Sequence, residues 1–346
     1  MSNYIKRARA VLTGPRANTI LGLVVLGVVL LLVVPRVIQG GPSYLLQTIV
    51  FGAAAGALYA LIALGYTMVY GIIELINFAH GDIFTLGAFI SLPVLGLFGI
   101  TSLSGPGGLA VIPILIAVFA IVMVINGLIN VGIERVAYRP LRNSPRLAPL
   151  ITAVGMSFVL EGIMYLWKGP TNVHYPDLLP PNRIQLAGGT SIAYKDLIVI
   201  ALAVILVTIL TLFISRSRLG KAMRATAQDR DAAQLMGIDI NRTISAAFFI
   251  GASLAGAGGI IYGLYYNNLS FDLGFENGLI AFTAAVFGGI GNIQGAALGG
   301  LGIGLIRAMN DGYFSTAWTD VVLFGILIAV LVFRPTGLLG ARVPEK

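Results

Sequence analysis

The chain has 346 residues, of which 57 % are hydrophobic and 10 % are charged, and it carries 44 glycines. Soluble proteins have about 25 % charged residues and about 7 % glycine, so the composition excludes an ordinary soluble domain. The absence of cysteine excludes disulfides and thiolate metal sites. A net charge of +8 could indicate nucleic-acid binding, and the distribution of the charge along the chain decides this question. We predict an all-α polytopic membrane protein whose glycines let neighbouring membrane helices approach closely.

Apolar runs predict the membrane spans. The first run, residues 19–34, follows four basic residues as in a signal peptide. No small-residue cleavage pattern comes after it, so we predict a retained span with its N-terminus inside. The second run, residues 44–70, exceeds the roughly 20 residues needed to cross and must tilt or bend. Further spans are predicted at residues 83–100, 109–130, 147–167, 197–214, 244–266 and 319–333.

A polar break interrupts the apolar stretch 59–88, where Glu74, Asn77, His80 and Asp82 occur together. Polar groups in hydrocarbon need partners inside the protein or an aqueous cavity. We therefore predict that the break lines or hinges a translocation pathway, with its side chains sharing one face of a helix toward the subunit interior or a partner permease. The alternative is a solvated cytoplasmic turn in which these residues cap local structure.

A second break follows residue 278. The segments 279–287 and 296–309 are short for a crossing, and GGIGNIQG at 288–295 separates them. Short, glycine-interrupted segments indicate a broken span or a re-entrant hairpin, and the linker is expected near the membrane midplane. A glycine-rich loop outside the membrane is the alternative. The pathway candidates here are Gly288, Gly289, Gly291, Asn292 and Gly295.

Basic residues predict the topology. The segments placed inside, 1–16, 131–147, 215–243 and 334–346, hold most of the lysines and arginines, as the positive-inside rule requires. This distribution explains the positive charge without nucleic acid, because it faces an anionic membrane surface. With both termini inside, the number of spans is even: eight if 279–310 is a re-entrant pair and ten if it crosses twice, which we prefer.

The inside loop 216–242 is rich in helix-favouring residues, and we predict one cytoplasmic helix over residues 219–237. Its Asp-Ala-Ala followed by Gly237 resembles the EAA-x-x-x-G pattern with which binding-protein-dependent ABC importer permeases dock on their ATPase, although Asp replaces Glu and no Leu-Pro follows. The alanine side should face the ATPase, with charges at its rim and Gly237 at the exit; a solvated amphipathic loop is the alternative. The coupling candidates are Ala222, Arg224, Ala225, Asp229, Asp231, Ala232, Ala233 and Gly237.

Several segments in order closely resemble the LivH-type permease of the high-affinity branched-chain amino acid ABC importers, over about residues 44–340. They are YALIALGYTMVYGIIELINFAHGD (59–82), IERVAYRP (133–140), SRLGKAMRATAQDRDAAQLMGI (217–238), AFTAAVFGGIGNIQGAALGG (281–300) and RPTGLLG (334–340). The resemblance implies a type II-importer-like bundle of eight to ten membrane segments in a bacterial inner membrane. It also implies a LivM-type permease partner, two ATPase subunits and a periplasmic binding protein, with a homodimer left open.

The resemblance implies neutral, chiefly branched-chain, amino acids as cargo, and relatives that move urea or short amides give the alternative. No G-x-x-x-x-G-K-[ST] motif occurs, so the chain cannot cradle ATP phosphates and uphill transport needs a separate ATPase. Two histidines, His80 and His174, are too few for a histidine metal cluster, and we expect no cofactor and no catalytic residues. A secondary transporter, a solute channel and a membrane enzyme are the competing classes, which solute-stimulated ATP hydrolysis would separate.

Overall fold

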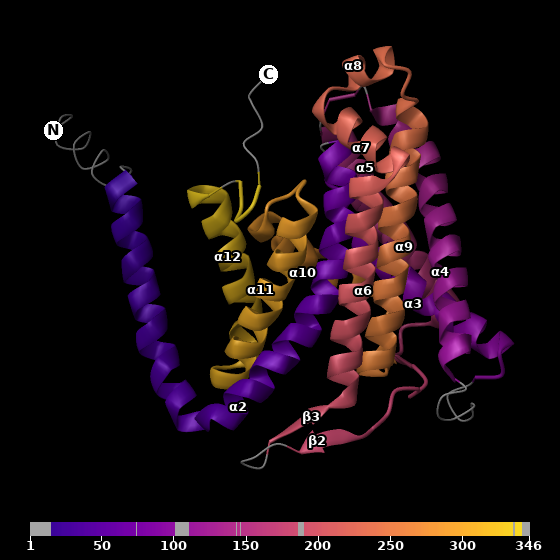
Figure 1. Ribbon diagram of the computed structural model, residues 1–346. Helices are drawn as coiled ribbons and strands as arrows, with labels where there is room; N and C mark the ends of the chain where they lie inside the picture. Colours follow the sequence, from indigo (N-terminus) through magenta and orange to yellow (C-terminus); the bar gives the residue numbers. More distant parts are fainter. Residues whose placement is uncertain are drawn as a thin grey trace, which may run out of the picture.

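The computed structural model describes residues 15–73, 75–100, 111–142, 144–145, 147–185, 190–334 and 336–340, with side chains described from residue 34 onward. Helices dominate this part of the chain (Figure 1). The α-helices are α2 (Pro15–Ile73), α3 (His80–Leu97), α4 (Val111–Ile133), α5 (Leu147–Lys168), α6 (Tyr194–Arg216), α7 (Arg218–Gln228), α8 (Arg230–Leu235), α9 (Ile240–Tyr266), α10 (Leu273–Gly288), α11 (Ile293–Tyr313) and α12 (Thr319–Phe333).

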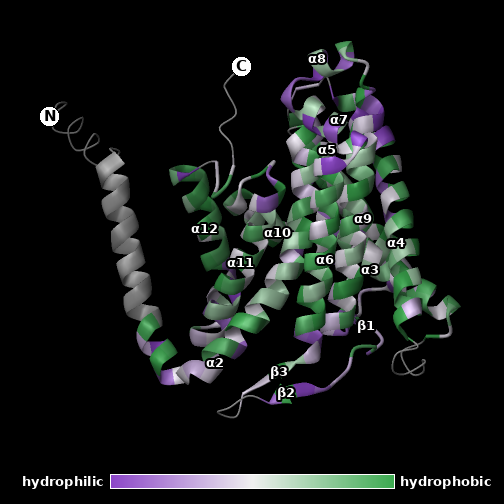
Figure 2. Ribbon diagram, viewed as in Figure 1, coloured by the Kyte–Doolittle hydropathy of each residue, from purple (hydrophilic) through white to green (hydrophobic). Residues whose placement is uncertain are grey.

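Shorter elements connect these helices. A π-helical turn, η2 (Glu134–Tyr138), and a 3-10 turn, η3 (Arg139–Leu141), follow α4, and η4 (Thr316–Trp318) precedes α12. Strand β1 (Val173–His174) pairs antiparallel with β4 (Asn268–Leu269), and β2 (Arg183–Gln185) pairs antiparallel with β3 (Ser191–Ala193). Strands β2 and β3 lie at the end of the bundle opposite α8 in Figure 1, and β1 lies toward the same end in Figure 2.

Seven helices of the described residues are long and apolar enough to cross a membrane, and α10 is a shorter apolar helix. Apolar residues run along most of the bundle, whereas polar residues gather around α7 and α8 (Figure 2). The prediction of an all-α polytopic membrane protein is therefore confirmed.

Helix α2 joins the first two predicted spans into one element with a sharp bend. Gly41 has φ 76 and ψ 166 at the bend, a conformation open mainly to glycine, and Pro42 follows it. The part of α2 before the bend stands apart from the bundle, and the part after it runs through the middle (Figure 1). The bend at Gly41 thus lies between the first two predicted runs, before the second run begins at residue 44.

Small residues hold the central helices together. Gly56 of α2 packs against the backbone of Gly304 in α11, and Gly87 of α3 packs against Gly256 in α9. At these positions the backbones approach so closely that a Cβ would collide with the facing helix. The glycine content therefore serves helix packing, as predicted from composition.

The bundle contains two similar units that run in opposite directions. In the first, α2 ends, a non-helical stretch follows and α3 begins inside the bundle; in the second, α9 ends, residues 267–272 follow and α10 begins inside the bundle. Helices α2 and α9 are antiparallel, because Phe51 lies beside Tyr265 and Gly65 lies beside Gly251. Such inverted repeats with discontinuous helices recur in membrane transporters.

Candidate functional site

The polar break after α2 turns back into the bundle. Helix α2 ends at Ile73, residues 75–77 are irregular, and residues 78–79 form a turn before α3 begins at His80. His80 packs against Gly65, eight residues before the end of α2, so the chain returns by about 12 Å at 1.5 Å per helical residue. The single helical face expected for Glu74, Asn77 and His80 is wrong, because this stretch is not helical; Glu74 itself lies outside the described residues.

The other three predicted pathway residues are buried within the chain. Asn77 Oδ1 accepts a 2.7 Å hydrogen bond from the hydroxyl of Tyr138, and the carboxylate of Asp82 accepts one from Ser157 of α5. The ring of His80 lies edge-on to Tyr66, with 4.9 Å between centroids. The structure therefore directs these side chains into the bundle and away from its outer surface.

The first turns of α3 and α10 meet in the interior. Gly81 packs against the backbone of Gly274 and Gly278, and Gly274 in turn packs against Asp82. Helix N-termini carry partial positive charge, so two of them converge beside one carboxylate. Asn77 Nδ2 and Asp82 Oδ1 have no hydrogen-bond partner among the described residues. Unpartnered buried polar atoms are rare in folded proteins and mark this junction as a candidate functional position.

The predicted break between α10 and α11 is present. Gly289 and Gly291 have φ of 110 and 91, values that side-chain-bearing residues rarely adopt. Asn292 caps α11 by accepting a 3.1 Å hydrogen bond from Gly295, whose backbone packs against Gly288. The chain therefore reverses here through glycine geometry and a side-chain cap.

The location of this linker differs from the midplane position expected. Gly291 packs against Gly71, two residues before the end of α2, so the linker lies near the end of the bundle. The C-terminal residues 336–340 close over it: Leu339 donates to the carbonyl of Gly288 at 2.9 Å, and Asn292 donates to the carbonyl of Leu339 at 2.8 Å. The interior junction is formed by α3 and α10 instead.

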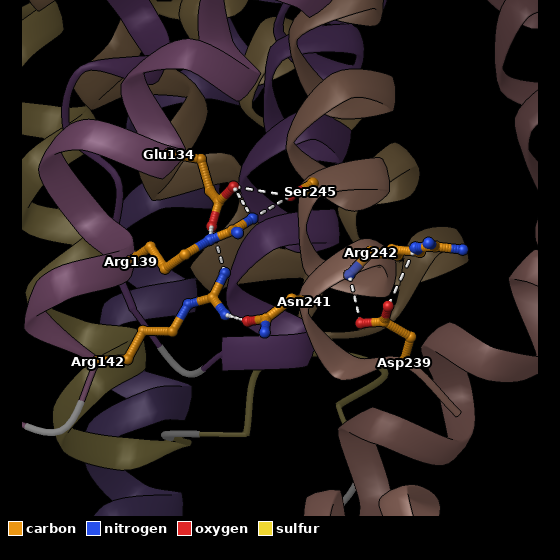
Figure 3. A network of polar contacts seen from close by, with 7 residues as sticks. All are labelled: Glu134, Arg139, Arg142, Asp239, Asn241, Arg242 and Ser245. Carbon is orange, nitrogen blue, oxygen red and sulfur yellow. Dashed lines mark hydrogen bonds and ion pairs between the residues drawn. The ribbon is translucent and has the colours of Figure 1, made fainter. Parts of the chain in front are cut away.

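A cluster of charged groups joins the end of α4 to the start of α9 (Figure 3). Glu134 is completely buried and accepts hydrogen bonds from Arg139 at 3.0 Å, from Arg142, and from Ser245 at 2.7 Å. Arg142 also donates to Asn241 at 2.7 Å. We call Glu134, Arg139, Arg142, Asn241 and Ser245 the Glu134 cluster.

Burial and pairing act on Arg142 in opposite directions. Desolvation lowers the pKa of Arg142, while the negative charge of Glu134 opposes that shift. An arginine remains charged at neutral pH even so. The Glu134 cluster therefore holds a buried carboxylate with its charge compensated, which such a group requires.

The predicted cytoplasmic helix consists of two helices. Asp229 ends α7 with an extended backbone and caps α8 by accepting hydrogen bonds from Asp231 and Ala232, each of 3.0 Å. Asp229 thus starts a new helix and cannot continue the preceding one. At the other end, Gly237 has φ 82, and Ile238 donates to the carbonyl of Ala233 at 3.1 Å. Gly237 therefore ends the helical region, as we predicted from the sequence.

The expected alanine face is not a single surface. Ala233 is buried against the bundle, Ala222 and Ala225 are half-buried, and Ala232 is exposed. Arg224 donates to the carbonyl of Ile214 at the end of α6, so it does not stand at a free rim. Asp231 is exposed in the first turn of α8. The most exposed apolar side chains of this region are those of Leu235, at 89 %, and Met236, at 82 %.

Two side chains contact the chain at the break after α2, one from α8 and one from η2. Arg230, the first residue of α8, donates a 3.0 Å hydrogen bond to the carbonyl of Ile72. On the other side of the break, Tyr138 of η2 holds Asn77. No sequence pattern predicted roles for Arg230, Tyr138 and the Glu134 cluster, although IERVAYRP at 133–140 is one of the segments that carry the family resemblance.

These features define a multi-pass helical membrane protein whose polar groups gather at helix breaks and at one end, as in a transport permease. Residues 48–331 match the family described as branched-chain amino acid transport system, permease component. The chain belongs to this family. It is therefore a subunit of a transport system and is not an enzyme.

Individual relatives agree with this assignment. The high-affinity branched-chain amino acid permease protein BraD of Pseudomonas aeruginosa is 44 % identical over 308 residues, which cover 87 % of this chain and 97 % of BraD. The corresponding LivH protein of Escherichia coli is 42 % identical, covering 88 % of this chain and 98 % of LivH. The predicted resemblance to LivH-type permeases is confirmed.

A more distant match is the probable branched-chain amino acid permease protein LivM of Methanocaldococcus jannaschii. It is 27 % identical over 141 residues, or 37 % of this chain and 40 % of LivM. LivH and LivM permeases of one organism thus both resemble the chain, which supports a permease partner within the transport system. No solved structure is significantly similar to the chain.

Proposed function

We propose that the chain is the membrane-spanning permease subunit of an ATP-driven importer for branched-chain or other neutral amino acids. The names of the relatives support the cargo. The observation that carries the mechanism is the 3.0 Å hydrogen bond from Arg230 to the carbonyl of Ile72. Through it, movement of α8 reaches the last turn of α2, next to the break that leads to the interior junction.

The end of the bundle with α7, α8 and η2 is the cytoplasmic end in this proposal. Its exposed arginines and lysine satisfy the positive-inside rule. Both termini then lie on the cytoplasmic side of a bacterial inner membrane. The bundle then has the architecture of a type II importer. Ten crossings follow if α2 crosses twice and if the breaks before α3 and α10 each complete a crossing with the helix that follows.

The junction of α3 and α10 is the proposed gate. It is closed here, because Gly81 is in backbone contact with Gly274. Asn77, His80 and Asp82 would line the path once the two helix N-termini separate. Gly288, Gly289, Gly291, Asn292 and Gly295 would serve as the hinge at the far end of α10, since glycines absorb backbone rotation at low cost.

The proposed importer also contains partner subunits. We place a LivM-type permease beside this chain, two ATPase subunits under α7 and α8, and a periplasmic binding protein at the opposite end. Ala232, Leu235 and Met236 form the exposed apolar surface that an ATPase groove would cover. Helix-in-groove docking uses an apolar anchor of this kind.

Reconstitution tests the proposal. The two permeases and the ATPase subunits are purified together and reconstituted in proteoliposomes, and ATP hydrolysis and L-leucine uptake are measured with and without the binding protein. We expect uptake that requires ATP and the leucine-loaded binding protein. Failure of the ATPase subunits to assemble with the permeases would contradict the importer, whereas uptake of urea or a short amide alone would replace only the cargo.

A further inference from the structure

A second candidate site lies at the end of the bundle opposite α8. It is a cavity of about 530 Å³ between the bent part of α2, the start of α6, the ends of α9 and α11, and the β2–β3 hairpin. These elements meet at the same end of the molecule in Figure 1. Ligand pockets typically measure about 300–1,000 Å³, so the volume suits a small solute. We call this cavity the outer pocket.

Lys195 lines the outer pocket and has hydrogen-bond donors available for a ligand. Lys195 Nζ donates to the carbonyl of Tyr265 at 3.2 Å and lies 5.1 Å from the centre of that ring. An ammonium group has three donors, and within the described residues only the hydrogen bond to Tyr265 is formed. Two donors of Lys195 are therefore left for a ligand.

The pocket also presents carboxylates. Asp196 accepts one hydrogen bond on each oxygen, from the hydroxyl of Tyr265 at 2.8 Å and from the backbone of Ala193 at 3.3 Å. Asp311 lines the pocket from α11 and lies 3.6 Å from Arg307. A carboxylate offers about four acceptor positions, so Asp196 retains capacity for a ligand ammonium.

Apolar surface completes the lining. The rings of Phe51 and Tyr265 lie 6.5 Å apart, and Val50 and Ile192 add aliphatic surface beside them. A pocket of this composition matches a solute with one positive group, one negative group and a hydrocarbon branch.

We infer that the outer pocket binds the free amino acid as a zwitterion, before it enters the path through the bundle. Lys195 holds the α-carboxylate, Asp196 holds the α-ammonium group, and the aliphatic side chain packs against Phe51 and Tyr265. The inference takes its substrate class from the proposed function and adds a receiving site to it.

The test measures direct binding to the complete importer. Saturation-transfer NMR with L-leucine is recorded on the detergent-solubilised complex without binding protein. Two competitors each lack one charge: 4-methylpentanoate has no ammonium group, and 3-methylbutylamine has no carboxylate. The variants are Lys195→Met and Asp196→Asn. Arg36→Met is the matched control, because Arg36 also donates to a carbonyl, that of Tyr313 at 3.1 Å, and stacks on a ring outside the pocket.

We expect L-leucine binding by the unmodified complex, weakened about tenfold or more by Lys195→Met and by Asp196→Asn and unchanged by Arg36→Met. Each competitor should displace L-leucine more weakly than L-valine does. Absence of L-leucine binding, binding by either pocket variant that is as tight as that of the unmodified complex, or displacement by a singly charged competitor that is as strong as that by L-valine would overturn the inference.

A second readout separates this inference from the proposed function. L-leucine uptake by proteoliposomes with binding protein tests the importer itself. Uptake without pocket-dependent binding overturns the outer pocket alone, whereas pocket-dependent binding without uptake overturns the proposed function alone. If Lys195→Met changes only the affinity of the complex for the binding protein, the pocket is a docking surface and the inference is wrong.

Discussion

The hydroxyl of Tyr138 donates a 2.7 Å hydrogen bond to Asn77 Oδ1, although the two residues are 61 positions apart. Both side chains are buried, so water cannot replace the bond. The contact ties η2 to the non-helical stretch between α2 and α3. The contact lies between the Glu134 cluster and the interior junction. Loss of this hydrogen bond should therefore affect the packing of both.

Removing this hydroxyl should weaken the hold on the break. In Tyr138→Phe the ring remains and Asn77 loses its partner, which costs about 1–3 kcal/mol for a buried polar group. We expect a lower unfolding temperature of the detergent-solubilised protein and slower amino acid uptake. Tyr44→Phe is the control for the unfolding temperature alone, because Tyr44 donates to Gly312 from an exposed position but also lines the outer pocket. Equal behaviour of the two variants would show that the Asn77 contact is dispensable.

Glu134→Gln should destabilise the protein, because it leaves Arg139 and Arg142 without their carboxylate. We expect a loss of about 1–3 kcal/mol, below the full effect of breaking a buried ion pair, since Arg139 keeps partial solvent contact. Asp239→Asn is the control: its pair with Arg242 is exposed, asparagine still caps α9, and the change should be within about 1 kcal/mol. Thermal unfolding in detergent compares the two variants.

Tryptophan substitutions at neighbouring alanines should have different effects. Ala232 is exposed, so Ala232→Trp should leave the permease folded and inserted but abolish binding-protein-stimulated ATP hydrolysis. Ala233 is buried, so Ala233→Trp should overpack the bundle by about 1–3 kcal/mol and lower the unfolding temperature. Normal ATP hydrolysis and uptake in Ala232→Trp would mean that α8 does not dock on the ATPase.

The meeting of α3 and α10 depends on Gly81. In Gly81→Ala the added methyl group meets the backbone of Gly274 and Gly278, so we expect a loss of about 1–3 kcal/mol and reduced uptake. Gly132→Ala is the matched control, because a Cβ at that helical position meets nothing within 4 Å and alanine favours the helix. A permease with Gly81→Ala that is as stable as one with Gly132→Ala would show that the junction is loosely packed.

Much of the fold could be predicted because its signals are local. Apolar runs locate the long helices, the glycines of 288–295 mark the reversal between α10 and α11, and Gly237 marks the exit of α8. The division of α7 from α8 was also accessible, because Asp229 precedes charged and small residues as an N-cap does. We predicted one helix over 219–237 because helix-favouring residues dominate this segment, and the N-cap signal at Asp229 was given less weight.

The site could not be predicted to the same extent, because its partners are distant in sequence. Glu134 meets Ser245 across 111 positions, and Gly81 meets Gly274 of the other inverted unit. One sequence signal of the repeat does exist: Asn-Phe-x-x-Gly at 77–81 corresponds to Ser-Phe-x-x-Gly at 270–274. Five positions are too few to separate a repeat from coincidence without the structure.

The strap formed by residues 336–340 has a practical consequence for work on this permease. Leu338 and Leu339 supply the donors that satisfy the last carbonyls of α10, at Phe287 and Gly288. A truncation that removes the strap would leave these carbonyls and Asn292 without their partners at the linker between α10 and α11. An affinity tag or fluorescent fusion must therefore begin beyond Gly340, and one that replaces the strap should be expected to alter the transporter that it was meant only to report.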